Sequence, residues 1–277
     1  MMFGIKFGKN FIFTVPKKTP RYVETHDFQI SADTQHDMVL FNLKYQILPD
    51  PAARTQGRTT FGHMTPEDDA RDAGASIRIL GRWNTVGESA GYCVCEAPDA
   101  KALHGWLLNW APVATIEAHP VRDDNAARRI LLGAEEAPFT VDYSHVGDAA
   151  KSGESLYFIE YRFQPGKRAE GFKAFANMTE EQDRADAGQN TCLGRWHDLG
   201  RGCGVAVCSS PSQEALHAWA HHWTELCDCR IVPVVNDAEC RENIVAKPQY
   251  QPPVAAQASD PPPVARQSSG NGCCTVS

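Results

Sequence analysis

The sequence LGRWN at residues 80–84 returns as LGRWH at residues 193–197. In both places a strand-like run, a proline and a helix with paired tryptophans follow, and the spacing is kept without a gap as far as Pro120 and Pro233. An internal repeat of this size indicates that the chain contains two copies of one structural unit. The repeat predicts the architecture but identifies neither a ligand nor a reaction.

The length and composition limit the possible classes of protein. A chain of 277 residues has room for two domains, each with its own core. The 27 Lys and Arg residues are outnumbered by 34 Asp and Glu residues, so we expect no nucleic-acid partner. No apolar stretch reaches the roughly 20 residues of a membrane-spanning helix. The ten cysteines lie mainly in apolar runs, which is typical of reduced, buried thiols in a cytoplasmic protein.

Each copy predicts the same order of elements. Apolar and polar residues alternate over 39–47 and over 157–163, which predicts a strand with one buried face. Helical segments, two further strands, the tryptophan helix, a fourth strand and a terminal helix follow in both copies. This β-α-β-β-α-β order is ferredoxin-like, and two such sheets can pack open face to open face. We therefore expect an α+β fold in which both repeats form one pseudo-dimeric barrel, with the expected limits 1–35 (N-terminal extension), 36–133 (repeat 1), 134–153 (linker), 154–246 (repeat 2) and 247–277 (Pro-rich tail).

These residues also resemble a known family. The order Gly-Arg-Trp-His-Asp, a Gly-Val-Ala strand, a helix with paired tryptophans, then Pro-Val and an acidic cap is similar to the small bacterial and algal domains called DUF3303. The resemblance covers about 38–132 and 154–245, and it implies kinship with dimeric α+β barrels. The first copy departs from the pattern, because Asn84-Thr85 stands where the second copy has His197-Asp198. The family name implies a fold and no chemistry.

The candidate site residues follow from alternation along the strands. Arg82 and Arg195 point away from the neighbouring tryptophans, which we expect to anchor the sheet to its helices. Arg195, His197 and Glu160 would then face the space between the sheets, where they are our candidates for anion binding and proton transfer. An equally open interpretation is a buried polar network that fixes the pairing of the copies. The candidate ligand-binding residues are Arg82, Asn84 and Arg162, and we expect any chemistry to be carried by the second half.

Metal and cofactor sites are not predicted. His217 and His221 lie four residues apart near Cys227 and Cys229, but the two cysteines lie on a strand with both side chains on one face, and His217 repeats His104 in a copy that lacks the other ligands. No nucleotide loop, dinucleotide glycine motif or nucleophile elbow is present. The paired tryptophans are expected to belong to the core outside the barrel; they are Trp106, Trp110, Trp219 and Trp223.

The last residues suggest lipid attachment. After Lys247 the chain is rich in Pro, Gln, Ala and Ser, and it ends in Cys273-Cys274-Thr275-Val276-Ser277. This ending partly fits a prenylation motif at Cys274, with Cys273 placed for palmitoylation, and two lipids would hold the protein stably at a membrane. The plain alternative is an unstructured tail that happens to end in cysteines. If the lipid is present, replacing Cys274 by Ser should release the protein from membranes.

Two functions from different classes remain. The first is a small-ligand-binding or scaffold protein, tethered by its C-terminus to the cytoplasmic face of a membrane. The alternative is a cofactor-independent enzyme, of the isomerase, lyase or monooxygenase type, that acts on a small anionic or aromatic metabolite inside the barrel. In the enzyme, Arg195 would orient the substrate and His197 would act as acid or base.

Overall fold

The structure is a computed structural model, and it describes residues 38–246. The expected extension at 1–35 and the tail from 247 lie outside these residues. Cys273 and Cys274 are part of that tail, so lipid attachment stays a prediction. No helix within 38–246 has both the length and the apolar character needed to cross a membrane.

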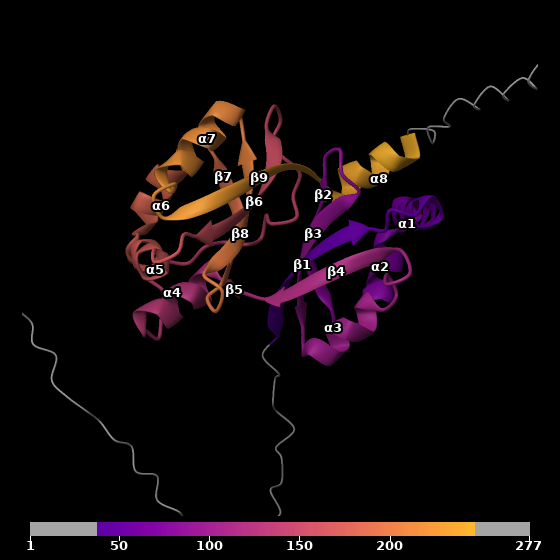
Figure 1. The fold of residues 1–277 in the computed structure, drawn as a ribbon, viewed down its shortest axis with the longest axis horizontal. Helices are drawn as coiled ribbons and strands as arrows, with labels where there is room; N and C mark the ends of the chain where they lie inside the picture. The colour runs from indigo at the N-terminus through magenta and orange to yellow at the C-terminus, as the bar shows by residue number, and fades with distance from the viewer. Residues whose placement is uncertain (1–37, 247–277) are drawn as a thin grey trace, which may run out of the picture. The chain divides into compact units, whose positions relative to one another are not determined.

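Both halves contain the expected α+β elements in the expected order (Figure 1). The first half comprises β1 (Val39–Ile47), α1 (Pro51–His63), α2 (Pro66–Ala73), β2 (Arg78–Thr85), β3 (Ala90–Ala97), α3 (Ala100–Leu107), β4 (Ala114–Pro120), β5 (Arg122–Asp123) and α4 (Asp124–Leu132). The second half comprises β6 (Ser155–Phe163), α5 (Arg168–Asn177), α6 (Glu180–Ala187), β7 (Thr191–Asp198), β8 (Cys203–Ser210), α7 (Gln213–His222), β9 (Cys227–Asn236) and α8 (Asp237–Ala246).

All strands join one antiparallel sheet that closes on itself. The strand order is β4-β1-β3-β2-β9-β6-β8-β7-β5. The two edge strands, β4 and β5, are separated in sequence by Val121 alone, so one continuous segment pairs with β1 at one end and with β7 at the other. Strand β9 makes the equivalent bridge between β6 and β2. The predicted pseudo-twofold α+β barrel is confirmed.

Two tryptophans fill the inside of the barrel. Trp83 and Trp196 are fully buried, with ring centroids 6.2 Å apart, and they pack with Phe158 and with valines from both halves. Val146, from the segment that we expected to be a polar linker, is buried in the same cluster. The connector between the copies therefore contributes to the core as well as joining the halves.

The expectation that these tryptophans face the helices is wrong, because each of their strands contains a β-bulge. The pairing register shifts between Ile79 and Gly81, and again between Cys192 and Gly194. One extra residue in a strand reverses the face of every side chain that follows. The tryptophans therefore turn into the barrel, and the preceding arginines turn to the outside, where the helices lie.

The paired tryptophans outside the barrel tie helices together. The indole N–H groups of Trp106 and Trp110 both donate to Oδ2 of Asp72, each at 2.8 Å. In the second half, the equivalent pair donates to Oδ2 of Asp186, each at 2.9 Å. One carboxylate in each half thus joins the tryptophan helix to the helix before it, and these tryptophans lie outside the barrel, as expected.

Candidate ligand-binding site

The terminal helix of each copy covers the sheet of the other copy. Helix α8 packs against α1 in the first half, and α4 packs against α5 in the second (Figure 1). The terminal helices reach the other copy because the bridging strands lead directly into them: β5 continues into α4, and β9 continues into α8. Each half therefore needs residues from both repeats to complete the layer between its sheet and its helices.

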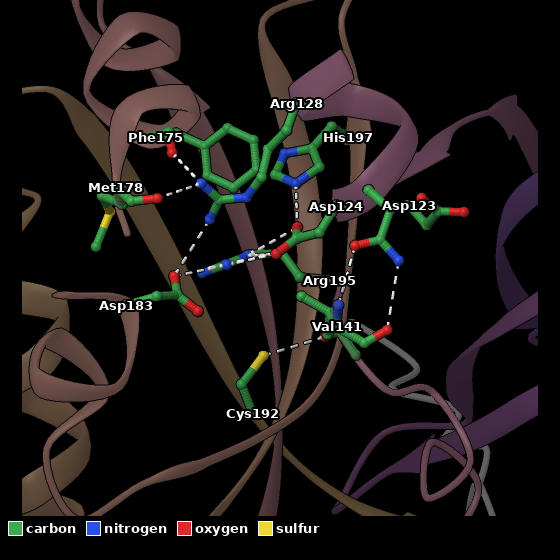
Figure 2. Close-up of polar contacts among 12 residues, drawn as sticks. Asp123, Asp124, Arg128, Val141, Phe175, Met178, Asp183, Cys192, Arg195 and His197 are labelled. Carbon is green, nitrogen blue, oxygen red and sulfur yellow. Dashed lines mark hydrogen bonds and ion pairs between the residues drawn. The ribbon is translucent and has the colours of Figure 1, made fainter. Parts of the chain in front are cut away.

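A closed ionic cluster lies in this layer of the second half (Figure 2). Arg195 donates from Nε and Nη2 to the carboxylate of Asp124, at 3.0 and 2.5 Å, and from Nη2 to Asp183 at 2.8 Å. His197 Nε2 lies 2.5 Å from the other carboxylate oxygen of Asp124. Burial raises the pKa of Asp124, but Arg195 and His197 outweigh it and hold that pKa well below its usual range.

A second arginine completes this cluster. Arg128 is fully buried, and its Nη1 donates to the carbonyl oxygens of Phe175 at 2.6 Å and Met178 at 3.1 Å. Its guanidinium lies 4.2 Å from the centre of the Phe175 ring and 3.5 Å from Asp183. Two arginines and two aspartates therefore balance their charges, and Asp183 is the most exposed of the four. This is the polar network of our second interpretation, located outside the barrel.

The first half contains the equivalent cluster with one difference. Arg82 donates to Asp237, with the shortest distance 2.6 Å, and to Asp69 at 2.9 Å, while Arg241 also pairs with Asp69. Asn84 stands where the second half has histidine, and it accepts a 2.7 Å hydrogen bond from the Tyr45 hydroxyl. The expected asymmetry between the two copies is therefore real at this position.

Two of the three predicted catalytic residues lie together, and Glu160 lies apart from them. Arg195 and His197 share the cluster outside the barrel, so their expected position between the sheets is wrong. Glu160 lies on the barrel side of β6, where it accepts from Lys44 at 2.9 Å and from Arg230 at 2.6 Å. Arg162 is exposed at the end of the same strand. The bulge in β7 separates these residues, because it reverses one strand and leaves β6 unchanged.

A pocket lies in the first half. Its volume is about 550 Å³, and it opens between the outer face of the sheet and helices α1, α3 and α8. Arg82 and Asn84, two of the predicted ligand-binding residues, line it together with Tyr45. The rest of the wall is mainly apolar and includes Leu43, Ile47, Phe61, Trp106, Ile116 and Ile244.

Large aromatic side chains occupy the equivalent position in the second half. Ile47 corresponds to Phe163 and Arg58 corresponds to Phe172, and the two phenylalanine rings pack edge to face with centroids 4.9 Å apart. His197, in place of Asn84, lies 4.3 Å from the ring of Phe175. The half that we expected to carry the chemistry is therefore filled at this point, while the other half keeps an open space.

Sequence reasoning found Arg82 and Asn84 but missed the helix α1 wall of the pocket. The α1 wall follows from differences in side-chain size between the copies, and no motif marks those differences. Positions where the first copy has a smaller side chain than the second, such as Ile47 against Phe163, would have predicted the pocket. The class of the protein is now defined: it is a single-chain α+β barrel of two repeats, with a pocket between the sheet and the helices of the first half.

Residues 39–135 and 155–247 match the family model described as "Domain of unknown function (DUF3303)", so the chain belongs to this family. The predicted resemblance is thereby confirmed in both copies. A comparison with curated protein sequences found no match.

Several solved structures share the fold at low sequence identity. A mutant of chlorite dismutase from Candidatus Nitrospira defluvii is 10% identical, over 74% of this chain and 94% of that chain, with a TM-score of 0.44. An anthrone oxidase-like protein is 8% identical, over 72% and 92%, with a TM-score of 0.42. A DypB variant in complex with manganese is 8% identical, over 74% and 95%, with a TM-score of 0.43. Similarities of this strength assign no activity to this chain.

The buried histidine predicts a pH dependence of stability. Burial lowers the pKa of His197, and the opposing effect of Asp124 does not restore it. As pH falls below the unfolded-state pKa of about 6.5, the unfolded chain takes up a proton before the folded one does, so stability is lost toward acid. Replacing His197 by Asn, the residue of the first copy, should flatten this decline between about pH 6.5 and 5. Urea unfolding midpoints across that range would test this. Equal slopes of the midpoint against pH in the two proteins would contradict it.

Proposed function

We propose that this protein binds a small organic molecule in the pocket of its first half. The observation that carries the proposal is that the pocket of the first half reaches the sheet, whereas the pocket of the second half, about 400 Å³, lies between α4 and α5 and has no strand residue among the described residues of its wall. The volume of the first-half pocket, about 550 Å³, lies within the range of small-molecule sites, roughly 300–1,000 Å³. A mainly apolar wall with a few convergent polar groups is also the usual composition of such sites.

The polar groups at the base of the pocket are suited to orienting a ligand. Arg82 is held by two carboxylates, and Asn84 is held by the Tyr45 hydroxyl. Burial raises the pKa of Tyr45 well above its ordinary value, so the phenol stays protonated and acts as a hydrogen-bond donor. Groups fixed in this way can position a bound molecule without reorganisation.

The second candidate function is catalysis in the same pocket. The tyrosine and asparagine lie next to the space that a substrate would occupy, whereas Arg195 and His197 are enclosed in their own cluster. A cofactor-independent enzyme would therefore use Tyr45 and Asn84 to polarise its substrate, in place of the histidine that we selected from the sequence. Recovery of a bound compound as a changed product would favour catalysis over simple binding.

Filling the pocket tests the proposal. A Cβ atom at Gly57 would lie 3.6 Å from Ile47 and Val113, so a side chain fits there and extends into the space. Gly57→Phe should weaken binding of any hit from a small-molecule thermal-shift screen by at least about tenfold, or 1.4 kcal/mol. Gly105→Phe is the matched control, because Gly105 is an exposed helical glycine with no neighbouring atoms within 4 Å.

Binding should remain in the Gly105 variant and be lost in the Gly57 variant. Circular dichroism and urea unfolding of both proteins would verify that each keeps its fold. Equal affinity in the two variants would place the ligand elsewhere and would refute the proposed function.

A further inference from the structure

We infer that the ligand of this pocket is an amphipathic organic anion, whose charged group binds Arg54 and Arg58 while its apolar part enters the pocket. The inference rests on the proposed function and adds the chemical class of the ligand. The two arginines lie four residues apart on α1, on the same helical face as Gly57 and Phe61. Both side chains line the pocket, so a single group at its opening can contact both.

These two arginines have no acidic partner within residues 38–246. Helix α1 itself contains no acidic residue. Asp50, the nearest acidic residue in the sequence, caps the helix by accepting a hydrogen bond from the Ala53 amide at 2.8 Å. Neither Arg54 nor Arg58 takes part in an ion pair in that part of the chain, and both are exposed. Their positive charge is therefore available to a ligand.

The other charged groups of the pocket are already paired. Arg82 is held by Asp237 and Asp69 deep in the pocket. Glu88 is the one acidic side chain among the described residues that line the pocket, and it lies exposed, 3.9 Å from Arg230. The opening of the pocket therefore has a positive balance, which favours a negatively charged group there.

The depth of the pocket selects an apolar body. The wall is mainly apolar and includes isoleucine, leucine and aromatic side chains, and the indole N–H of Trp106 is already bonded to Asp72. Moving a charge into such surroundings is costly, so the charged end of the ligand stays near the opening. An aromatic or aliphatic group of moderate size would pack against the inner wall, and one anionic group would pair with the two arginines.

Within residues 38–246, the two unpaired arginines and the open pocket occur in the same copy of the repeat. The second copy has Arg168 in place of Arg54, but this guanidinium donates to the carbonyl oxygen of Leu199 and lies near the ring of Phe172. Phe172 itself stands in place of Arg58. The pair of available arginines and the open pocket therefore occur in the same copy, as expected if both serve one ligand.

Three related naphthalene probes test the charge requirement on the full chain. Naphthalene-2-carboxylate and 2-naphthyl phosphate are anions, and naphthalene-2-carboxamide is their neutral counterpart. By titration calorimetry, we expect the better anion to bind at least about tenfold more tightly than the amide, a difference of 1.4 kcal/mol. The preference should shrink as salt is raised, because the arginines are exposed. The relative affinities of the two anions distinguish a carboxylate ligand from a phosphate ester.

Replacing both arginines should remove the preference and leave the amide affinity unchanged. The double variant is R54Q/R58Q, and the control is R71Q, which removes a charge of the same sign from an exposed position on α2 outside the pocket. Equal binding of anions and amide that Gly57→Phe abolishes would overturn the anion inference and leave the proposed function standing. Binding of none of the probes, or binding that Gly57→Phe does not weaken, would count against both.

Discussion

Replacing Asp124 by Asn is expected to lower the free energy of unfolding by about 3–5 kcal/mol, the usual cost of removing one partner from a buried ion pair. The carboxylate is about 1% exposed and accepts three hydrogen bonds from Nε and Nη2 of Arg195. Asparagine keeps the shape but removes the charge, so two buried arginines would share Asp183 alone. The midpoint of urea unfolding, with the m-value checked for constancy, gives the change.

Asp237→Asn is the matched control in the other half. Its carboxylate is 29% exposed, and Arg82 would keep Asp69 at 2.9 Å. We expect a smaller loss there, about 1–2 kcal/mol. Equal losses of unfolding free energy in the two variants would show that burial does not determine the stability of these clusters. That result would contradict the description of the Asp124 cluster as closed.

Adding one methyl group to equivalent glycines should have opposite effects in the two halves. At Gly171 a Cβ atom would lie 2.1 Å from Cε1 of Phe163, so the ring must move away from its packing with Phe172. Overpacking of this kind costs about 1–3 kcal/mol, even after the small gain in helix propensity. At Gly57 the nearest atoms are 3.6 Å away, so alanine fits and should stabilise the helix by roughly 0.5–1 kcal/mol.

Urea unfolding of Gly171→Ala and Gly57→Ala would show this reversal of sign. The pair tests the claim that the pocket is a real difference in packing between the copies. Destabilisation by both substitutions would mean that the first half is packed as tightly as the second. That result would contradict the presence of an open pocket at Gly57.

Much of the fold could be predicted from the repeat alone. Periods of two and of 3.6 residues located the strands and helices, and the ferredoxin-like order in both copies led to the closed barrel. The faces of the second strand could not be predicted in the same way. Simple alternation places Trp83 with Ile79, and the bulge at Gly81 breaks that alternation. A bulge depends on the partner strand, which the local sequence does not reveal.

The candidate site was predicted only in part. Arg195 and His197 share one face of β7, as their spacing predicts, but Asp124 comes from the other copy, and no local pattern indicates that it meets them. The pocket depends on small differences in bulk between equivalent residues, such as Ile47 and Phe163. Those differences gain meaning only when the repeats are superimposed in three dimensions.

Methyl NMR of isoleucine-labelled protein tests the location of the ligand most directly. Ile47, Ile116 and Ile244 line the pocket, whereas Ile159 and Ile231 pack against the helices of the second half. On titration with the tightest-binding naphthalene probe, we expect the methyl signals of the first three to shift and those of the other two to stay in place. Shifts confined to Ile159 and Ile231, with the first-half signals unchanged, would contradict a binding site in the first half.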